Sequence, residues 1–136
     1  TSGSAWLHNR QLFEKLDFKM VDKRGRFELM QLPLAGERKI KLLNWETKLQ
    51  NYSGWHLLYS NQCPWHVKSV NVIKNICNEV AVDINIKVLE SSEEIKNVPS
   101  GFGVFALICN GRLLADHYIS ETKFRNILKK ELNEPN

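Results

Sequence analysis

Residues 60–66 read Ser60-Asn61-Gln62-Cys63-Pro64-Trp65-His66. They join an apolar run at 55–59 to an amphipathic stretch that continues to Val80. A cysteine where a strand gives way to a helix, followed by proline at the first helical position, is one way in which α/β folds present a thiol. His66 stands where a second cysteine would be needed for a disulfide across the helix start. The stretch therefore predicts single-thiol chemistry, metal binding or no chemical role for Cys63.

Helical and strand patterns alternate on both sides of Cys63. Residues 82–88 alternate apolar and polar side chains with a period of two, which predicts a half-buried strand. Asn110-Gly111 between two apolar runs predicts a tight hairpin. We expect strands at 55–60, 82–88, 103–109 and 112–118, and helices at 64–79, 91–97 and 120–132. The order β-α-β-α-β-β-α predicts an α/β fold with a mixed four-stranded sheet, the arrangement of thioredoxin-like domains.

The first 54 residues have a different organisation. Helical spacing predicts a helix at 5–16, and a hairpin follows, with strands at 18–22 and 27–32 around Gly25. A helix and a hairpin alone bury too little apolar surface to be stable. The segment around Gly36 is the expected boundary, and a polar connecting helix should follow it and stop at Ser53-Gly54. We therefore expect three parts: 1–33, a linker at 34–54, and a domain at 55–132.

Composition excludes several classes of protein. The 136 residues carry 19 Lys and Arg against 15 Asp and Glu, and the excess is spread along the chain. No basic stripe interleaved with aromatic residues is present, so nucleic acid is not an expected partner. The longest uncharged apolar stretch, 98–110, is far shorter than the roughly 20 residues of a membrane span. Three cysteines, an odd number without a signal peptide, predict a cytoplasmic protein without disulfides.

Several separated motifs in the second half resemble one known family. The motifs are residues 59–65, residues 98–106 (Val-Pro-Ser-Gly-Phe-Gly-Val-Phe-Ala) and residues 110–120 (Asn-Gly-Arg-Leu-Leu-Ala-Asp-His-Tyr-Ile-Ser). They look like the YoaP-like domain, which is found at the C-terminal end of some bacterial GNAT-family N-acetyltransferases. The resemblance covers residues 55 to about 130.

The first 33 residues resemble the end of the acetyltransferase domain that precedes such a domain. Asn9, the run 12–18 (Leu-Phe-Glu-Lys-Leu-Asp-Phe) and the run 27–29 look like the last helix and closing hairpin of a GNAT fold. The resemblance implies that Asn9 lies near acetyl-CoA and that Phe13 replaces a tyrosine that often acts as general acid. The family's glycine-rich phosphate loop would lie upstream of Thr1, so we expect a fragment that is inactive in acetyl transfer by itself.

Cys63, Trp65 and His66 are the candidate site residues of the second half. The positive end of the helix dipole favours a thiolate at Cys63, and His66, one turn on, could stabilise that anion or act as a base. Trp65 at the exposed helix start could contact a ligand or partner, or pack against another part of the chain. The bland alternative for Cys63 is a small residue packed under a loop.

Other polar residues are weaker candidates. Cys63 and His66 supply only two metal ligands, so we predict no metal site. Cys77 and Cys109 lie in apolar patterns and should be buried core thiols. Asp116 and His117, neighbours in an expected strand, should point to opposite faces and form no acid–base pair.

The sequence thus predicts the C-terminal part of an N-acetyltransferase that moves an acetyl group from acetyl-CoA to an amine of a small molecule or peptide. Its thioredoxin-like part would be an accessory domain. The alternative is a non-enzymatic binding or redox-sensing module that acts through Cys63. The oligomeric state is not predicted.

Overall fold

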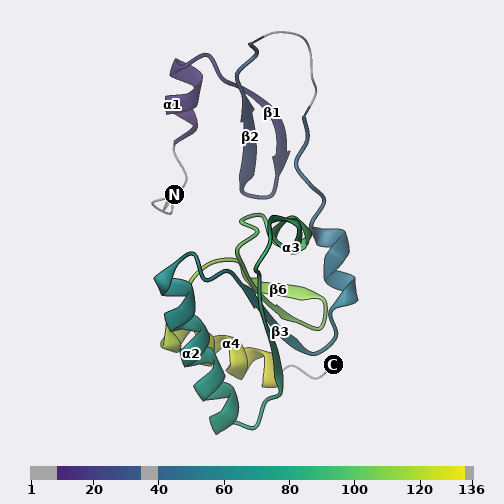
Figure 1. The fold of residues 1–136 in the computed structure, drawn as a ribbon, viewed down its shortest axis with the longest axis vertical. Helices are drawn as coiled ribbons and strands as arrows, with labels where there is room; N and C mark the ends of the chain where they lie inside the picture. Colours follow the sequence, from purple (N-terminus) through teal and green to yellow (C-terminus); the bar gives the residue numbers. More distant parts are fainter. Residues whose placement is uncertain (1–8, 35–39, 134–136) are drawn as a thin grey trace. The chain divides into compact units, whose positions relative to one another are not determined.

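The computed structural model describes residues 9–34 and 40–133 (Figure 1). The chain divides into two compact units, Thr1–Leu43 (unit 1) and Asn44–Asn136 (unit 2). Each unit has its own sheet, and each is described here by itself. The α helices of the described residues are too short or too polar to cross a membrane.

Unit 2 is built on a mixed four-stranded sheet. Its strands are β3 (Trp55–Tyr59), β4 (Ile84–Val88), β5 (Phe105–Cys109) and β6 (Arg112–Ala115). They lie in the order β4-β3-β5-β6. β3 runs parallel to β4 and antiparallel to β5, and β6 runs antiparallel to β5. The predicted α/β class with a mixed four-stranded sheet is therefore confirmed.

Helices cover both faces of this sheet. On one face lie α2 (Pro64–Glu79) and α4 (Glu121–Asn133), which share an apolar cluster with Leu57, Phe105 and Leu107 of the sheet. On the other face, η1 (Glu46–Asn51, a 3-10 helix) and α3 (Ser92–Asn97) cover a smaller cluster around Leu58, Ala106 and Ile108. Neighbouring residues of a strand thus serve opposite faces, as the period of two requires.

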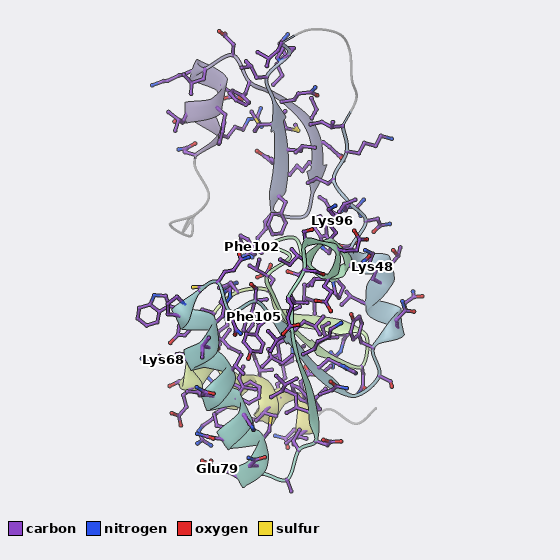
Figure 2. The ribbon with its side chains drawn as sticks, viewed as in Figure 1. Lys48, Lys68, Glu79, Lys96, Phe102 and Phe105 are labelled. Carbon is purple, nitrogen blue, oxygen red and sulfur yellow. The ribbon has the colours of Figure 1, made fainter. Side chains whose placement is uncertain are left out.

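The larger cluster supplies most of the core. Leu57, Ile73, Phe105, Leu107 and Phe124 are each 0% exposed, and Figure 2 shows Phe105 inside unit 2. Full burial of one such side chain contributes roughly 1.5–3 kcal/mol relative to exposure. This core fixes α2 against the sheet and thereby positions the residues at its amino end.

Local sequence signals explain how α2 begins and how the β5–β6 hairpin turns. Pro64 occupies the first turn of α2, where its missing N–H costs nothing. The hairpin turns at Asn110 and Gly111, whose φ angles of 45° and 74° are those of the predicted tight turn. Asn110 Oδ1 accepts a hydrogen bond from the Gly54 N–H (2.8 Å), which ties this turn to the start of β3.

Unit 1 consists of a short helix and a hairpin. These are α1 (Arg10–Lys15), β1 (Lys19–Arg24) and β2 (Phe27–Gln31), with an irregularity in the register between Met20 and Asp22. The Asp22 carboxylate accepts a hydrogen bond from the Leu42 N–H (2.8 Å), which holds the end of the unit to β1. None of the described residues of unit 1 is buried.

Some predicted boundaries are wrong. The expected connecting helix is reduced to η1, because Leu49 and Tyr52 pack onto the smaller cluster and this packing outweighs the helical spacing. β5 begins two residues late, after Gly103 at φ 71°, and β6 ends at Ala115 instead of reaching residue 118. β4 likewise begins at Ile84. Residues 5–8 of the predicted first helix and most of the predicted boundary at 34–38 lie outside the described residues.

Candidate functional site

Cys63 is the N-cap residue of α2. Its extended backbone (φ −119°, ψ 119°) turns the chain from the loop after β3 into the helix, and its side chain makes no capping hydrogen bond. The thiol is free and the residue is partly exposed. The sulfur thus lies at the amino end of a 16-residue helix, where the partial positive charge of the helix is greatest.

His66 lies one turn into α2 and points inward. It is only 9% exposed, and its ring centroid lies 5.3 Å from that of Phe105. Burial lowers the pKa of His66, and a backbone hydrogen bond with Ser60 opposes this only in part. Burial therefore favours the uncharged form of the ring. In that form the ring can accept a proton or a hydrogen bond, but it has no positive charge with which to stabilise a thiolate.

Trp65 takes part in an exposed aromatic group beside Cys63. Its side chain is 58% exposed, and its ring meets that of Tyr118 edge to face at 5.8 Å between centroids. The Lys68 ammonium lies 5.4 Å from the Trp65 ring centroid, a cation–π contact, and Figure 2 shows Lys68 on the outer side of α2. An exposed, partly immobilised tryptophan is a common contact residue for ligands and partners.

Two buried polar atoms near the start of β5 have no hydrogen-bond partner among the described residues. They are His66 Nδ1 and Ser100 Oγ, in side chains that are 9% and 5% exposed. Ser100 belongs to the loop before β5, and the Ser60 N–H donates to the Val104 carbonyl (2.9 Å), which joins that loop to the segment leading to Cys63. Unpaired buried polar atoms are uncommon and often mark functional sites or bound water.

Asp116 and His117 differ from their prediction. β6 ends at Ala115, so the two residues follow the strand and do not alternate across it. His117 Nδ1 lies 2.6 Å from Asp116 Oδ1, and the His117 ring centroid lies 6.3 Å from that of Phe102. The expectation that they point to opposite faces is wrong, because it assumed a strand that continues to Tyr118.

Cys77 and Cys109 are buried, as predicted. They are 1% and 4% exposed. Burial raises the pKa of Cys77 to about 11, and burial together with the Glu131 carboxylate raises the pKa of Cys109. Both thiols are therefore protonated at neutral pH and have little nucleophilic character. Within the part of the chain that the structure describes, no three His, Cys, Asp or Glu side chains are grouped so as to bind a metal.

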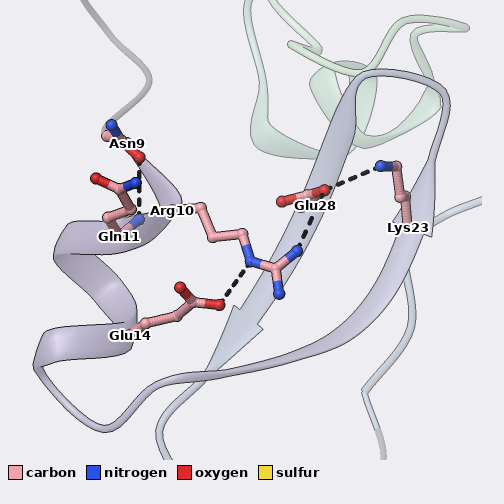
Figure 3. A network of polar contacts seen from close by, with 6 residues as sticks. All are labelled: Asn9, Arg10, Gln11, Glu14, Lys23 and Glu28. Atoms are coloured by element: carbon pink, nitrogen blue, oxygen red, sulfur yellow. Dashed lines mark hydrogen bonds and ion pairs between the residues drawn. The ribbon is translucent and has the colours of Figure 1, made fainter.

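In unit 1, Asn9 caps α1. Its Oδ1 accepts a hydrogen bond from the Gln11 N–H (3.0 Å), as Figure 3 shows. The cap is followed by Arg10, which binds Glu14 (2.7 Å) and approaches Glu28 of β2 (3.9 Å), and Lys23 of β1 also binds Glu28 (3.0 Å). These contacts link the helix to the hairpin and fix the place of Asn9.

Phe13 packs within unit 1. Its ring meets that of Phe18 edge to face, with 5.3 Å between centroids. Asn9 and Phe13 thus have structural roles in α1, and the amide nitrogen of Asn9 has no partner among the described residues.

Comparison with known proteins agrees with the resemblance of the second half. The family model described as YoaP-like matches residues 84–126, from β4 into α4. The chain is 25% identical over 126 residues to the "Uncharacterized N-acetyltransferase YoaP" of Bacillus subtilis (strain 168), an alignment that covers 90% of this chain and 50% of the relative. The chain therefore spans about half the length of the curated relative that it matches, and its similarity to YoaP-like proteins is at the level of distant homology.

Proposed function

We propose that the chain is the C-terminal part of a GNAT-family N-acetyltransferase, which moves an acetyl group from acetyl-CoA to an amine of a small molecule or peptide. Unit 1 would be the end of the acetyltransferase domain, and unit 2 a thioredoxin-like accessory domain. The observation that carries the proposal is the alignment of 90% of the chain with half of a protein described as an N-acetyltransferase.

The surface of unit 1 supports its assignment as part of a larger domain. Leu12 and Leu16 of α1 are 47% and 56% exposed, and Met20 and Val21 of β1 are 41% and 42% exposed. Four such apolar side chains on so small a unit are expected to be covered by further structure. The remainder of an acetyltransferase domain would supply that cover.

The described residues do not by themselves form an acetyl-CoA site. The side-chain oxygen of Asn9 is used in capping α1, which leaves only its amide nitrogen to donate to the cofactor. Phe13 has no hydroxyl group and cannot act as a general acid. When bound, acetyl-CoA would supply the activated acetyl group, and among the described residues the amide nitrogen of Asn9 is the group that the resemblance places near it.

The topology of unit 2 supports a thioredoxin-like assignment. The sheet order β4-β3-β5-β6, with α2 connecting the parallel pair β3–β4, agrees with the arrangement expected from the sequence. Cys63 lies where such domains present a thiol, at the junction of the loop after β3 and helix α2. Unit 2 would contribute substrate recognition or a thiol-dependent contact through Cys63, Trp65 and His66.

Acetyl-CoA binding to the complete gene product and to the 136-residue chain tests the proposal. By isothermal titration calorimetry, the complete protein should bind acetyl-CoA and the chain alone should not. Asn9→Ser keeps a capping oxygen and removes the amide donor, so it should weaken binding by about 3- to 10-fold without loss of stability. Gln11→Ala, also on α1, is the control. A complete protein that does not bind acetyl-CoA would refute the proposal.

A second candidate is a non-enzymatic binding or redox-sensing module. The observation in its favour is the partly exposed Cys63 beside Trp65, which is 58% exposed. This function requires no acetyl-CoA. A complete protein that fails to bind acetyl-CoA, but whose Cys63 reacts selectively, would favour the module.

A further inference from the structure

We propose that the first turn of α2 (residues 64–67) is a pH-sensitive switch: protonation of the buried His66 ring releases this turn from the sheet and frees Trp65 from Tyr118. The inference goes beyond the function proposed above, and it depends neither on acetyl transfer nor on the chemistry of Cys63. It follows from the burial of the ring, from an unpaired ring nitrogen and from the place of His66 at the positive end of a helix.

The uncharged His66 ring fits its site. The residue is 9% exposed, and its ring lies against that of Phe105, which is 0% exposed, with 5.3 Å between the centroids. The ring shares a hydrogen bond with the backbone of Ser60, whereas Nδ1 has no partner among the described residues. The tautomer with its proton on Nε2 therefore donates to the Ser60 carbonyl and leaves only an acceptor unpaired.

A second proton, on Nδ1, is disfavoured in the closed turn for three reasons. It creates a buried N–H group without an acceptor among the described residues. It places a charge where burial has removed water, which is why the pKa of His66 is lowered. It also adds positive charge in the first turn of a 16-residue helix, whose amino end is already positive. An open turn relieves all three, because water then solvates the imidazolium.

The surroundings of His66 supply no compensating charge among the described residues. The first turn of α2 contains no acidic residue, and the segments at 60–62 and 98–104 contain no charged side chain. Asp116, in the loop after β6, is already bound to His117 (2.6 Å). Burial and the Ser60 backbone determine the pKa of His66, with no contribution from a charged group. The titratable side chains of the neighbouring segments are Tyr59, Cys63, Lys68, Asp116, His117 and Tyr118.

The contacts of α2 limit the part of the helix that can open. Trp65 is 58% exposed and meets Tyr118 only through an edge-to-face ring contact. Ser69, by contrast, is 1% exposed, and its hydroxyl donates to the Ile119 carbonyl (2.9 Å). Ile73, one turn further on, is 0% exposed. The helix is thus fixed from Ser69 onward, and the opening is confined to the residues before it.

Acid favours the open turn. In the open turn the His66 ring has its ordinary pKa of 6.5, whereas burial lowers the pKa in the closed turn. The open form therefore binds more protons, so the closed form has its full stability above pH 6.5 and loses stability as the pH falls from there through the lowered pKa.

Amide hydrogen exchange of the full chain, measured by mass spectrometry at about pH 7 and about pH 5, tests the switch in a range where most carboxylates stay ionised. After correction for intrinsic rates, amides of residues 65–69 should exchange at least about threefold faster at the lower pH. Amides of β5 and of residues 73–79 should change little. In a parallel NMR titration, the His66 ring should titrate below pH 6.5.

Three variants identify the group that titrates. His66→Phe keeps a ring against Phe105, and His66→Gln keeps a donor for the Ser60 carbonyl, but neither can take up a proton in this range. Both should lose the difference in exchange between the two pH values. His117→Gln is the matched control, because it removes the other histidine at this end of unit 2, and it should respond to acid as the wild type does.

Three results would overturn the proposal: exchange in residues 65–69 that does not accelerate in acid, acceleration that persists in both His66 variants, or a His66 ring that titrates at or above pH 6.5. The NMR titration uses the unchanged chain, so the proposal stays testable if a variant fails to fold. Acetyl-CoA binding plays no part in these measurements, so the two proposals can fail separately.

Discussion

At the scale of single residues, Ala81 is the clearest case of local strain. It follows α2 in the left-handed conformation (φ 54°). The Val82 N–H donates to the Cys77 carbonyl (2.9 Å) and the Ala81 N–H to the Asn78 carbonyl (3.4 Å), the two bonds of a Schellman motif. Glycine is preferred at this position because a Cβ atom is strained there. Ala81→Gly should therefore raise the free energy of unfolding by about 0.5–1 kcal/mol, measured by urea denaturation.

The control for Ala81 is Asn78→Gly, an exposed position still inside the helix. Position 78 has ordinary helical backbone angles, so glycine relieves no strain there. Its greater flexibility in the unfolded chain should lower stability by about 0.5–1 kcal/mol. Ala81→Val should also be destabilising, since a β-branched side chain tolerates this conformation worse than alanine. A glycine at position 81 that lowers stability would show that the motif is not strained.

The burial of His66 could have been read from the sequence. Counting back from Val70, Ile73 and Cys77, the inward face of α2 reaches position 66, so the apolar face of the helix begins with an imidazole. The spacing of three residues from Cys63 suggests a role in thiol chemistry, whereas the spacing of four residues from Val70 predicts that His66 is buried. The charge state of the ring could not be predicted, because it depends on its desolvation between α2 and β5.

At the scale of elements, Glu94 controls the start of α3. Its carboxylate accepts hydrogen bonds from the N–H groups of Glu90 (2.9 Å) and Ser91 (3.3 Å) and binds Lys87 (2.8 Å), while the Ser91 hydroxyl accepts from the Glu94 N–H. The hydrogen bond from Lys87 and those from the backbone lower the pKa of Glu94 to about 2. A pKa lowered by folding stabilises the protein above the unfolded value of about 4.5, and this stability is lost as the pH falls towards 2.

The pH dependence of unfolding measures this contribution. The urea midpoint of the wild type should fall between about pH 4.5 and 2, and Glu94→Gln should reduce the size of that fall. Glu93→Gln is the matched control, because Glu93 is the neighbouring side chain and is 78% exposed. The role of Glu94 would be disproved if Glu94→Gln and the wild type lost stability in parallel over this range.

The success of prediction also differs between elements. α2 spans the predicted residues, and α3 lies within its predicted range and begins with a capping box of Ser91 and Glu94, because both helices are specified by their own sequences. The prediction of a helix in the connecting segment was wrong. The apolar side chains there pack onto the smaller cluster of unit 2, and this packing determines their spacing. The late start of β5 has a similar cause: Gly103 approaches Ile95, and a Cβ atom at that position would lie 3.2 Å from Ile95 Cγ2.

At the scale of the whole molecule, the structure differs most from the sequence prediction in the segment before β3, which belongs to unit 2. The sequence assigns 34–54 to a linker, whereas the compact unit of the structure begins at Asn44. Lys48 Nζ donates to the Lys96 carbonyl (3.1 Å) and to Asn97 Oδ1 (2.9 Å), which joins η1 to the end of α3. Such contacts between residues almost 50 positions apart cannot be inferred from one sequence.

We therefore expect unit 2 to fold when it is expressed alone and unit 1 not to do so. Unit 2 contains both apolar clusters, whereas none of the described residues of unit 1 is buried. Residues 44–136 expressed alone should unfold cooperatively in urea, within about 1 kcal/mol of the transition of the same unit in the full chain. Residues 1–43 alone should show little stable structure by circular dichroism, because a helix and a two-stranded hairpin bury too little apolar surface.

Amide hydrogen exchange on the full chain compares the stability of the two sheets within one molecule. Amides of β3 and β5, in the centre of the sheet of unit 2, should exchange far more slowly than those of β1 and β2, which form a sheet of only two strands. Equal protection of the two sheets, or a loss of more than about 1 kcal/mol from residues 44–136 when 1–43 are removed, would show that the units stabilise each other. Slow exchange confined to unit 2 would instead show that unit 1 has little stability of its own, in keeping with its exposed Leu12, Leu16, Met20 and Val21.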